Sequence, residues 1–190
     1  MRKTTVCFPF LFAALALACA TARYCPESDF ETRLIDDGAA VMISYYLGSS
    51  RTVRIPPRIR GLPVTQIGQN AFHSKNIARV SIPYGVTSIG NWAFRYNRLT
   101  GVSIPDTVSV IGRWAFADNR IAGVVIPDGV VVIGEAAFAA NRLSRVSVPD
   151  GVGRVERWTF QFNELAGATV PSGAYVHPEA FDPGVPIIRR

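Results

Sequence analysis

Histidine and cysteine are scarce in this chain, and their scarcity excludes most catalytic and metal-binding chemistry. The 190 residues include only two histidines, His73 and His177, which lie far apart in the sequence. Neither belongs to a nucleophile, metal-ligand or phosphate-loop motif. The three cysteines all lie within the first 25 residues and make no metal-binding pattern with a histidine. We therefore expect no enzyme activity, no metal site and no cofactor.

Lysine is almost absent, so the positive charge of the chain is carried by arginine. The chain has 20 lysine and arginine residues against 14 aspartate and glutamate residues, and only Lys3 and Lys75 are lysines. The charge is spread along the sequence, without the basic runs or motifs of nucleic-acid-binding proteins. We therefore expect no nucleic-acid partner. Arginine favours planar, two-point contacts with carboxylates or sulfates instead.

Long hydrophobic runs are also missing, except for one near the N-terminus. Arg2 and Lys3 precede an apolar run over residues 6–18, and small residues follow at Ala20-Thr21-Ala22. This pattern is typical of a secretory signal that is cleaved after Ala22, and the run is too short to span a bilayer. As an alternative, Ala16-Leu17-Ala18-Cys19 resembles a loose lipobox, in which Cys19 is the lipidated residue.

Either form of processing predicts an exported protein with no transmembrane span after the signal is removed. Its place would be the periplasm, the outer surface or the medium, with a lipid anchor if Cys19 is modified. The mature chain would carry a small positive charge of +4, because the signal removes two cations and no acids. Cys25 would then be a residue of the N-terminal tail.

A repeat of 22 residues occupies most of the remaining sequence. Its unit reads L-x-x-V-x-I-P-[DY]-[GT]-V-x-x-I-G-x-x-A-F-x-x-N-x. The proline column is Pro83, Pro105, Pro127, Pro149 and Pro171. The phenylalanine column is Phe72, Phe94, Phe116, Phe138 and Phe160. The asparagine column is Asn97, Asn119, Asn141 and Asn163. Such exact self-similarity indicates a repeat architecture.

Each part of the unit predicts a short element. Val102-Ser103-Ile104 alternates as a strand with one buried face does, and Pro105 ends it because proline has no N–H to donate. Residues 130–133 predict a second strand, and Ala137-Phe138 a helical turn. Stacked at about 4.8 Å per coil, equal positions fall in register. The phenylalanines would then form a spine, and the asparagines a ladder that satisfies backbone groups.

The I-P, I-G-x-x-A-F and L-x-x-V-x-I elements, from about Val53 to Phe181, resemble the bacterial BspA-like, or treponemal-type, leucine-rich repeat. This sequence differs in placing Asn where many members have Cys. The resemblance implies a mainly β repeat solenoid, a right-handed coil of 22-residue units with short parallel strands. It also implies an exported or surface-exposed protein, and several members act as adhesins for host extracellular-matrix proteins.

Both ends of the repeat are expected to be capped. Residues 30–34, the turn Asp36-Asp37-Gly38 and residues 41–46 predict an N-terminal hairpin cap, and the register is lost near Phe181, where a short C-terminal cap is expected. We therefore divide the chain into a secretory signal, an N-terminal tail with the hairpin cap, the leucine-rich repeats and a C-terminal tail. Their ranges are 1–22, 23–52, 53–181 and 182–190.

The exposed columns provide the candidate binding surface. The outward residues of the first strand are small, whereas aromatic and arginine residues gather around the A-F turn. The candidate site consists of Trp92, Trp114, Trp158, Arg95, Tyr96, Arg113, Arg157 and Phe162. These residue types are enriched in binding hot spots. The alternative is internal packing, with the indoles flat on the coil edge and Arg113, Glu135 and Arg157 stacked as alternating charges.

Two further columns have alternative interpretations. Asp106, Asp128 and Asp150 are turn residues or, less simply, a calcium site. The second column is a row of arginines, Arg98, Arg120 and Arg142, which ends at Glu164. It is interpreted as a solvated face or, alternatively, as an anion site.

The function expected is that of an exported, monomeric module that mediates protein–protein interaction, as a surface adhesin for host extracellular-matrix proteins. The alternative is a periplasmic structural or assembly protein that binds another bacterial protein.

Overall fold

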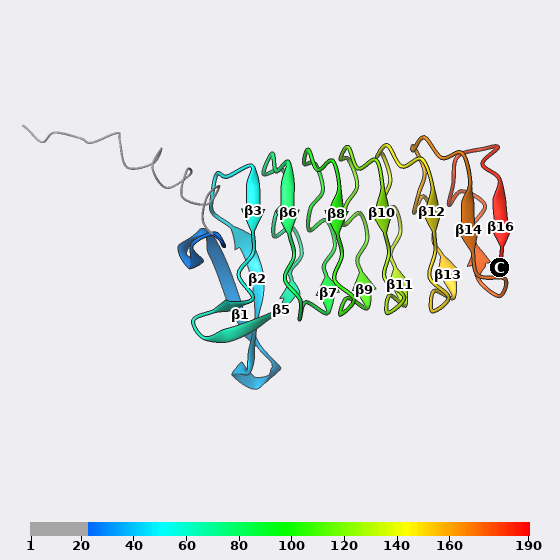
Figure 1. The fold of residues 1–190 in the computed structure, drawn as a ribbon. Coiled ribbons are helices and arrows are strands. Elements are labelled where there is room, and N and C mark those ends of the chain that lie inside the picture. The colour runs from blue at the N-terminus through cyan, green and yellow to red at the C-terminus, as the bar shows by residue number, and fades with distance from the viewer. Residues whose placement is uncertain (1–22) are drawn as a thin grey trace, which may run out of the picture.

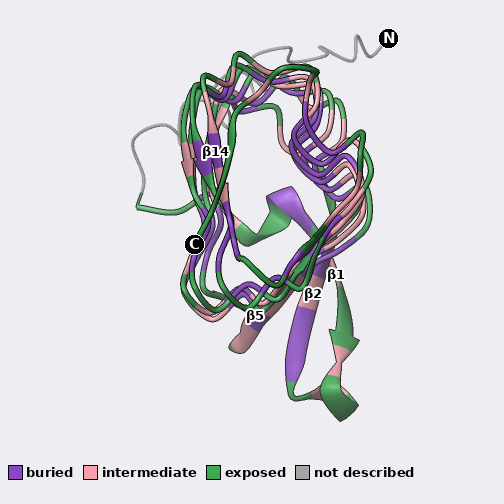
Figure 2. Cartoon of the chain, turned by 90° about the vertical axis from the view of Figure 1, so that its right-hand side faces the viewer, coloured by how far each residue is buried: buried purple, intermediate pink, exposed green. Residues whose placement is uncertain are grey.

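The computed structural model describes residues 23–190, which form a row of stacked coils (Figure 1). The predicted secretory signal, including the candidate lipidation residue Cys19, lies outside the described residues. Viewed along the row, the coils superimpose into one elongated ring (Figure 2). The prediction of a mainly β solenoid with 22-residue units is confirmed. No helix among residues 23–190 is both long and apolar enough to cross a membrane.

The first strand of each repeat begins after the leucine column and ends one or two residues before the proline, and a similar strand lies at each end of the row. These strands are β3 (Thr52–Arg54), β6 (Arg79–Ser81), β8 (Val102–Ser103), β10 (Val124–Val125), β12 (Val146–Ser147), β14 (Ala168–Val170) and β16 (Ile187–Arg189). They run side by side along the length of the molecule (Figure 1) and pair in parallel, with β3 on β6, β8 on β10, and β14 between β12 and β16. Val102 pairs with Val124, and Ser103 with Val125, which is the predicted register of 22 residues.

The second strand of each coil lies before the A-F turn. These strands are β5 (Leu62–Ile67), β7 (Ser88–Ile89), β9 (Val110–Ile111), β11 (Val132–Ile133), β13 (Arg154–Val155) and β15 (Tyr175–Val176). The first four continue one parallel sheet, and β13 pairs in parallel with β15. The short strand β4 (Arg58–Ile59) turns back onto β5 and lengthens the first coil.

The predicted N-terminal hairpin is present and covers the first coil. It consists of β1 (Phe30–Ile35), the 3-10 turn η2 (Asp36–Gly38) and β2 (Ala40–Tyr46), and the turn η1 (Glu27–Asp29) precedes it. β1 pairs antiparallel with β2, which in turn pairs in parallel with β5. The placement of Cys25 in a loose tail is wrong. It is 3% exposed, its backbone N–H donates to the Arg54 carbonyl, and its Sγ accepts from the Arg54 N–H.

At the other end, the range expected as a tail contains the strand β16. It pairs with β14, and its last residue, Arg189, donates from its guanidinium to the carbonyls of Ser172 and Ala174. Asp182 closes the turn side of the last coil: its carboxylate accepts from the N–H groups of Phe162 and Asn163 at 2.9 and 3.0 Å. In interior coils, carbonyls of the next coil accept these bonds, as Gln161 does from Ala140.

The phenylalanine spine is confirmed. Adjacent rings from Phe72 to Phe181 stack nearly parallel with centroids 4.9–5.7 Å apart. Phe94, Phe116 and Phe138 have no exposed surface. At the N-terminal end, Tyr46 of the hairpin stacks on Phe72 at 5.4 Å, so that the cap extends the spine by one ring.

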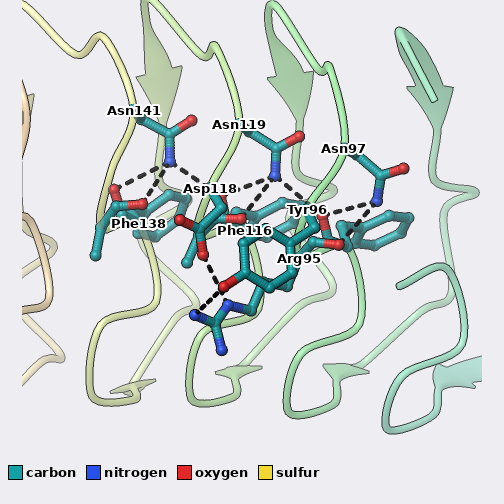
Figure 3. Close-up of polar contacts among 11 residues, drawn as sticks. Arg95, Tyr96, Asn97, Phe116, Asp118, Asn119, Phe138 and Asn141 are labelled. Atoms are coloured by element: carbon teal, nitrogen blue, oxygen red, sulfur yellow. Dashed lines mark hydrogen bonds and ion pairs between the residues drawn. The ribbon is translucent and has the colours of Figure 1, made fainter. Parts of the chain in front are cut away.

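The asparagine ladder is confirmed as well, and each member joins two coils (Figure 3). The Asn119 amide donates to the carbonyls of Phe94, Phe116 and Ala117 at 2.9–3.1 Å, while its Oδ1 accepts from the N–H of Leu99. Asn97, Asn141 and Asn163 repeat this pattern in their own coils. A single side chain thus satisfies four backbone groups that the bend would otherwise leave without partners.

A buried acid lies beneath the N-terminal cap. Asp29 is 9% exposed, and burial raises the pKa of its carboxyl. Tyr46 is fully buried; burial first, and then the negative charge of Asp29, raise its pKa to about 12. Gly48 leaves the room for both groups, since a Cβ at this position would lie 2.5 Å from Tyr46 Oη and 2.8 Å from Asp29 Oδ2.

Removing one ring from the spine should be costly. Phe116→Ala leaves a cavity between Phe94 and Phe138, and we expect a loss of about 3–5 kcal/mol in the free energy of unfolding. Chemical denaturation of the mature chain measures it. Val125→Ala, at a residue that is 82% exposed, is the control and should change stability by less than about 0.5 kcal/mol. A loss below about 1 kcal/mol at Phe116 would contradict the packing described above.

Asn119→Ala tests the ladder. It removes an acceptor from Leu99 and a donor from three carbonyls, so we expect a loss of about 1–3 kcal/mol in the free energy of unfolding. The exposed Thr100→Ala variant of the neighbouring coil is the control. An unchanged melting temperature at Asn119 would show that the ladder bonds are dispensable.

Asp29 should make the cap sensitive to pH. The pKa of the Asp29 carboxyl is raised in the folded chain. Below its ordinary pKa the carboxyl is neutral in both the folded and the unfolded chain, so its burial does not require burying a charge. The free energy of unfolding then falls as the pH rises through the raised pKa. Asp29→Asn removes this loss. The melting temperature of the variant relative to the parent should therefore rise between about pH 4 and pH 7. Glu31→Gln, an exposed position of β1 with the same charge change, is the control.

Candidate functional site

The A-F turn gives two residues of every coil the same backbone conformation. The residue two before each phenylalanine and the residue two after it both have left-handed backbone dihedrals, with φ between 52° and 60°. The first column is Asn70, Trp92, Trp114, Ala136 and Trp158. The second column is Ser74, Tyr96, Asp118, Ala140 and Phe162. The segment predicted as a helical turn is therefore a hydrogen-bonded turn, because these dihedrals interrupt a helix.

Trp114 and Trp158 contact each other, although the coil between them has no tryptophan in this column. Trp114 and Trp158 are two coils apart, yet their rings lie 6.1 Å apart edge to face. Ala136 occupies the same column in the coil between them, and its small side chain leaves the space for this contact. Both indoles pack on a small cluster of buried alanines, Ala117, Ala136 and Ala139. The gap in the tryptophan column is thus what allows the two neighbouring rings to pack.

Arg95 connects several members of the candidate site. Its guanidinium lies 4.2 Å from the Trp114 ring centre and 4.4 Å from that of Tyr96. It also donates to Asp118 at 2.7 Å and to the Tyr96 hydroxyl at 3.0 Å (Figure 3). With four contacts, the Arg95 side chain is held in one position. Sequence reasoning missed Asp118, although its place in the Tyr96 column, one coil further on, indicates such a contact.

Arg113 and Arg157 are also held by carboxylates. Arg113 pairs with Glu135 at 2.7 Å, whereas Arg157 pairs with Glu179 and lies 4.0 Å from the Trp158 ring centre. The predicted alternation of charges is therefore present in part. Arg157 pairs with Glu179 of the following coil, which stands 22 residues later in the same column and which sequence reasoning left out of it.

The remaining members differ in how they join this cluster. Trp92 is half-buried and takes part in none of the ring contacts described among residues 23–190. Tyr96 is 49% exposed and makes an edge contact with His73, while Phe162 is 63% exposed. Tyr96 and Phe162 belong to the same column but are three coils apart. The structure therefore brings Arg95, Tyr96, Trp114, Trp158 and Arg157 together, with Trp92 and Phe162 at the edges.

The face of the first strands is nearly bare. The residues that point outward from it are Ser81, Ser103, Val125, Ser147 and Thr169. Glycine precedes the strand in three of these coils, at Gly101, Gly123 and Gly167. A partner can approach this face closely, but it would find few large side chains there.

The aspartate row stands at the exposed turns that follow the prolines. Asp106, Asp128 and Asp150 are exposed, and Asp150 forms an ion pair with Arg190 at 3.3 Å. Within residues 23–190, no group of three or more His, Cys, Asp or Glu side chains is placed to hold an ion.

Comparison with known proteins gives one family and a set of similar solved structures. Residues 65–183 match the BspA type leucine-rich repeat region in six copies. The leucine-rich-repeat protein of T. pallidum is 30% identical, with 79% of this chain and 72% of that chain covered and a TM-score of 0.70. A leucine-rich-repeat protein of Bacteroides ovatus is 23% identical, with coverage of 80% and 41% and a TM-score of 0.65, which supports the fold alone. Among curated proteins, none matches.

Two tryptophans of one column allow a matched test of the packing. Trp92 and Trp114 share the same backbone dihedral, with φ of 55° and 57°, but only Trp114 contacts Arg95 and Trp158. Trp114→Ala should therefore cost about 1–3 kcal/mol in the free energy of unfolding, and Trp92→Ala less than about 1 kcal/mol. Equal losses in chemical denaturation would mean that the ring contacts contribute nothing.

Proposed function

The chain belongs to the BspA-type leucine-rich-repeat family, and we propose that it is an exported module that binds a protein partner through the aromatic and arginine residues of the A-F turns. The observation that carries this proposal is the clustering of these side chains on one face, partly exposed. Arg95, Tyr96, Trp114 and Trp158 contact one another there, and Phe162 extends the surface. Solenoids of this kind commonly use extended surfaces to bind other proteins.

The contacts within the face favour binding because they hold its side chains in place before a partner arrives. Arg95 is held by Asp118 and Arg157 by Glu179, so little side-chain freedom remains to be lost on association. Trp, Tyr and Arg are the residue types that carry most of the energy at protein interfaces. We assign the anchoring role to Tyr96 and Phe162, which are about half or more exposed, and a supporting role to the two packed tryptophans.

The other faces are weaker candidates for a protein partner. The outward side chains of the first strands are small, and interface anchors are large. No arrangement of nucleophile and base accompanies His73 or His177 in the described part of the chain, and the His177 Nδ1 accepts from the Glu179 N–H. We therefore propose no catalytic role.

The setting that we propose rests on residues outside the described part of the structure. The basic start, the apolar run and Ala20-Thr21-Ala22 support export. Within that setting, we propose a surface adhesin for a host extracellular-matrix protein, as the family resemblance implies. The alternative is an envelope protein of the periplasm with a bacterial partner. Protease treatment of intact cells distinguishes the two, since only a surface protein is digested without lysis.

The form of the mature N-terminus can be measured directly. We expect a mature chain that begins at Arg23, as mass spectrometry of the exported protein would show. A chain that begins at a lipidated Cys19 would contradict cleavage after Ala22 and would place the protein on a membrane.

The binding surface is tested with two matched double variants of the mature chain. Tyr96→Ser with Phe162→Ser removes the exposed anchors of the proposed face. Tyr84→Ser with Tyr175→Ser removes two exposed tyrosines elsewhere, 78% and 47% exposed, and Tyr175 lies beneath Arg154 much as Tyr96 lies beneath Arg95. The parent chain is first screened against purified matrix proteins and an envelope extract.

We expect the first double variant to lose capture of the partner by about tenfold or more, as loss of two anchors implies, while the second retains it. Both should melt close to the parent. If the two variants bind alike, the aromatic face is not the binding surface.

A further inference from the structure

We propose that Arg98, Arg120 and Arg142 form a binding site for an extended sulfated polysaccharide. Each arginine follows the ladder asparagine of its coil, and all three are exposed. This row lies beyond the ladder, on the way to the first strand, and contains none of the residues of the aromatic face. The proposal therefore does not depend on the protein-binding function proposed above.

The backbone sets the spacing of the row. The three N–H groups donate to the carbonyls of Ile77, Leu99 and Ile121 in the preceding coils at 2.8–3.0 Å. Beneath them, the rings of Phe94, Phe116 and Phe138 stack at 5.3 and 5.4 Å. The backbone positions of the three arginines are therefore fixed one coil apart, in a line along the solenoid.

These arginines form no ion pairs, unlike five other arginines of the described chain. Ion pairs hold Arg95, Arg113, Arg154, Arg157 and Arg190. For Arg98, Arg120 and Arg142, by contrast, the residues described here supply no side-chain hydrogen bond or ion pair. The nearest carboxylate along the chain, that of Asp118, is engaged by Arg95 at 2.7 Å.

The surface beside the row adds positive charge and little bulk. Small residues come next in each coil, at Thr100, Ala122 and Ser144. The residue after this small one is glycine in the coils of Arg98 and Arg120. In the coil of Arg142 it is the exposed Arg145, and in the coil before the row it is the exposed Arg79. Glu164 ends the row at the following coil. The result is a straight basic strip that is open on its outer side.

The strip has no evident use inside the fold. Like charges one coil apart repel, and salt or a bound anion reduces this repulsion. The guanidinium group is planar and forms paired hydrogen bonds with sulfate and carboxylate groups. An anion that satisfies several arginines in line must itself carry charges at regular intervals along an extended chain.

The neighbouring side chains favour a polysaccharide over other polyanions. The strip contains no aromatic residue on which a base could stack, as single-stranded nucleic acids require. It also has no large apolar anchor of the kind that binds a peptide. A sulfated polysaccharide presents its charges along a stiff backbone and needs neither. Short contacts to Thr100, Ala122 and Ser144 would allow the chain to lie close to the surface.

The experiment measures binding of heparin to the mature chain by titration calorimetry at about 0.1 M salt. Arg98→Gln with Arg120→Gln and Arg142→Gln should weaken binding by about tenfold or more and reduce its salt dependence. A matched triple variant, Arg33→Gln with Arg60→Gln and Arg154→Gln, removes the same charge from other faces and should stay within about twofold of the parent.

A variant that gains function makes the test sharper. Glu164→Arg extends the row by one coil and should tighten heparin binding, whereas Glu31→Arg makes the same charge change on the hairpin and should not. The triple variant of the row should melt at the same or a higher temperature than the parent, because it relieves repulsion. Loss of binding then cannot be attributed to unfolding.

Three results would overturn the proposal. The first is equal weakening by the two triple variants, which would show a response to net charge alone. The second is displacement of heparin by single-stranded DNA or polyglutamate at equal charge concentration, which would show that any polyanion binds. The third is a lower melting temperature of the row variant, which would indicate a structural role.

Discussion

Stacking of the coils at a constant register is the constraint on which the rest of this structure depends. A single coil of 22 residues has no second layer against which to bury its apolar side chains. Its neighbours supply that layer, through rings 4.9–5.7 Å apart and through asparagines that each bond to backbone groups of two coils. Both interactions depend on similar residues at equal places in each coil. The repeat is therefore most regular in its interior columns and variable outside them.

This division between interior and exterior explains where the candidate sites are found. The columns that carry Trp114, Tyr96 and Arg120 face outward, so that the stacking does not dictate their residue types. The stacking does place them, and it gives each column a fixed line along the solenoid. One face combines aromatic rings with arginines whose charge is balanced by Asp118, Glu135 and Glu179. Another carries arginines that form no ion pair among the described residues.

The two ends of the array show what happens where stacking stops. A terminal coil has neighbours on one side only, so its spine and its backbone groups need substitutes. Tyr46 of the hairpin extends the spine at one end. At the other end, the carboxylate of Asp182 accepts the two N–H groups of Phe162 and Asn163 that carbonyls accept in interior coils. Each substitution is local, and neither follows the 22-residue pattern.

The sequence alone determined the repeat fold, because a periodic pattern has one simple way to bury its apolar columns. It also determined the roles of Phe116 and Asn119 and the presence of the hairpin over residues 30–46.

The contacts between exposed side chains were decided by the tertiary structure. Trp114 reaches Trp158 only because Ala136 is small and the coils are closely spaced. The buried positions of Cys25 and Asp29, and the strand formed by Ile187–Arg189, likewise depend on partners that are distant in the chain and outside the repeat. Periodicity predicts which residues share a column, whereas the contacts between columns and at the ends depend on side-chain size and on the geometry of the assembled coils.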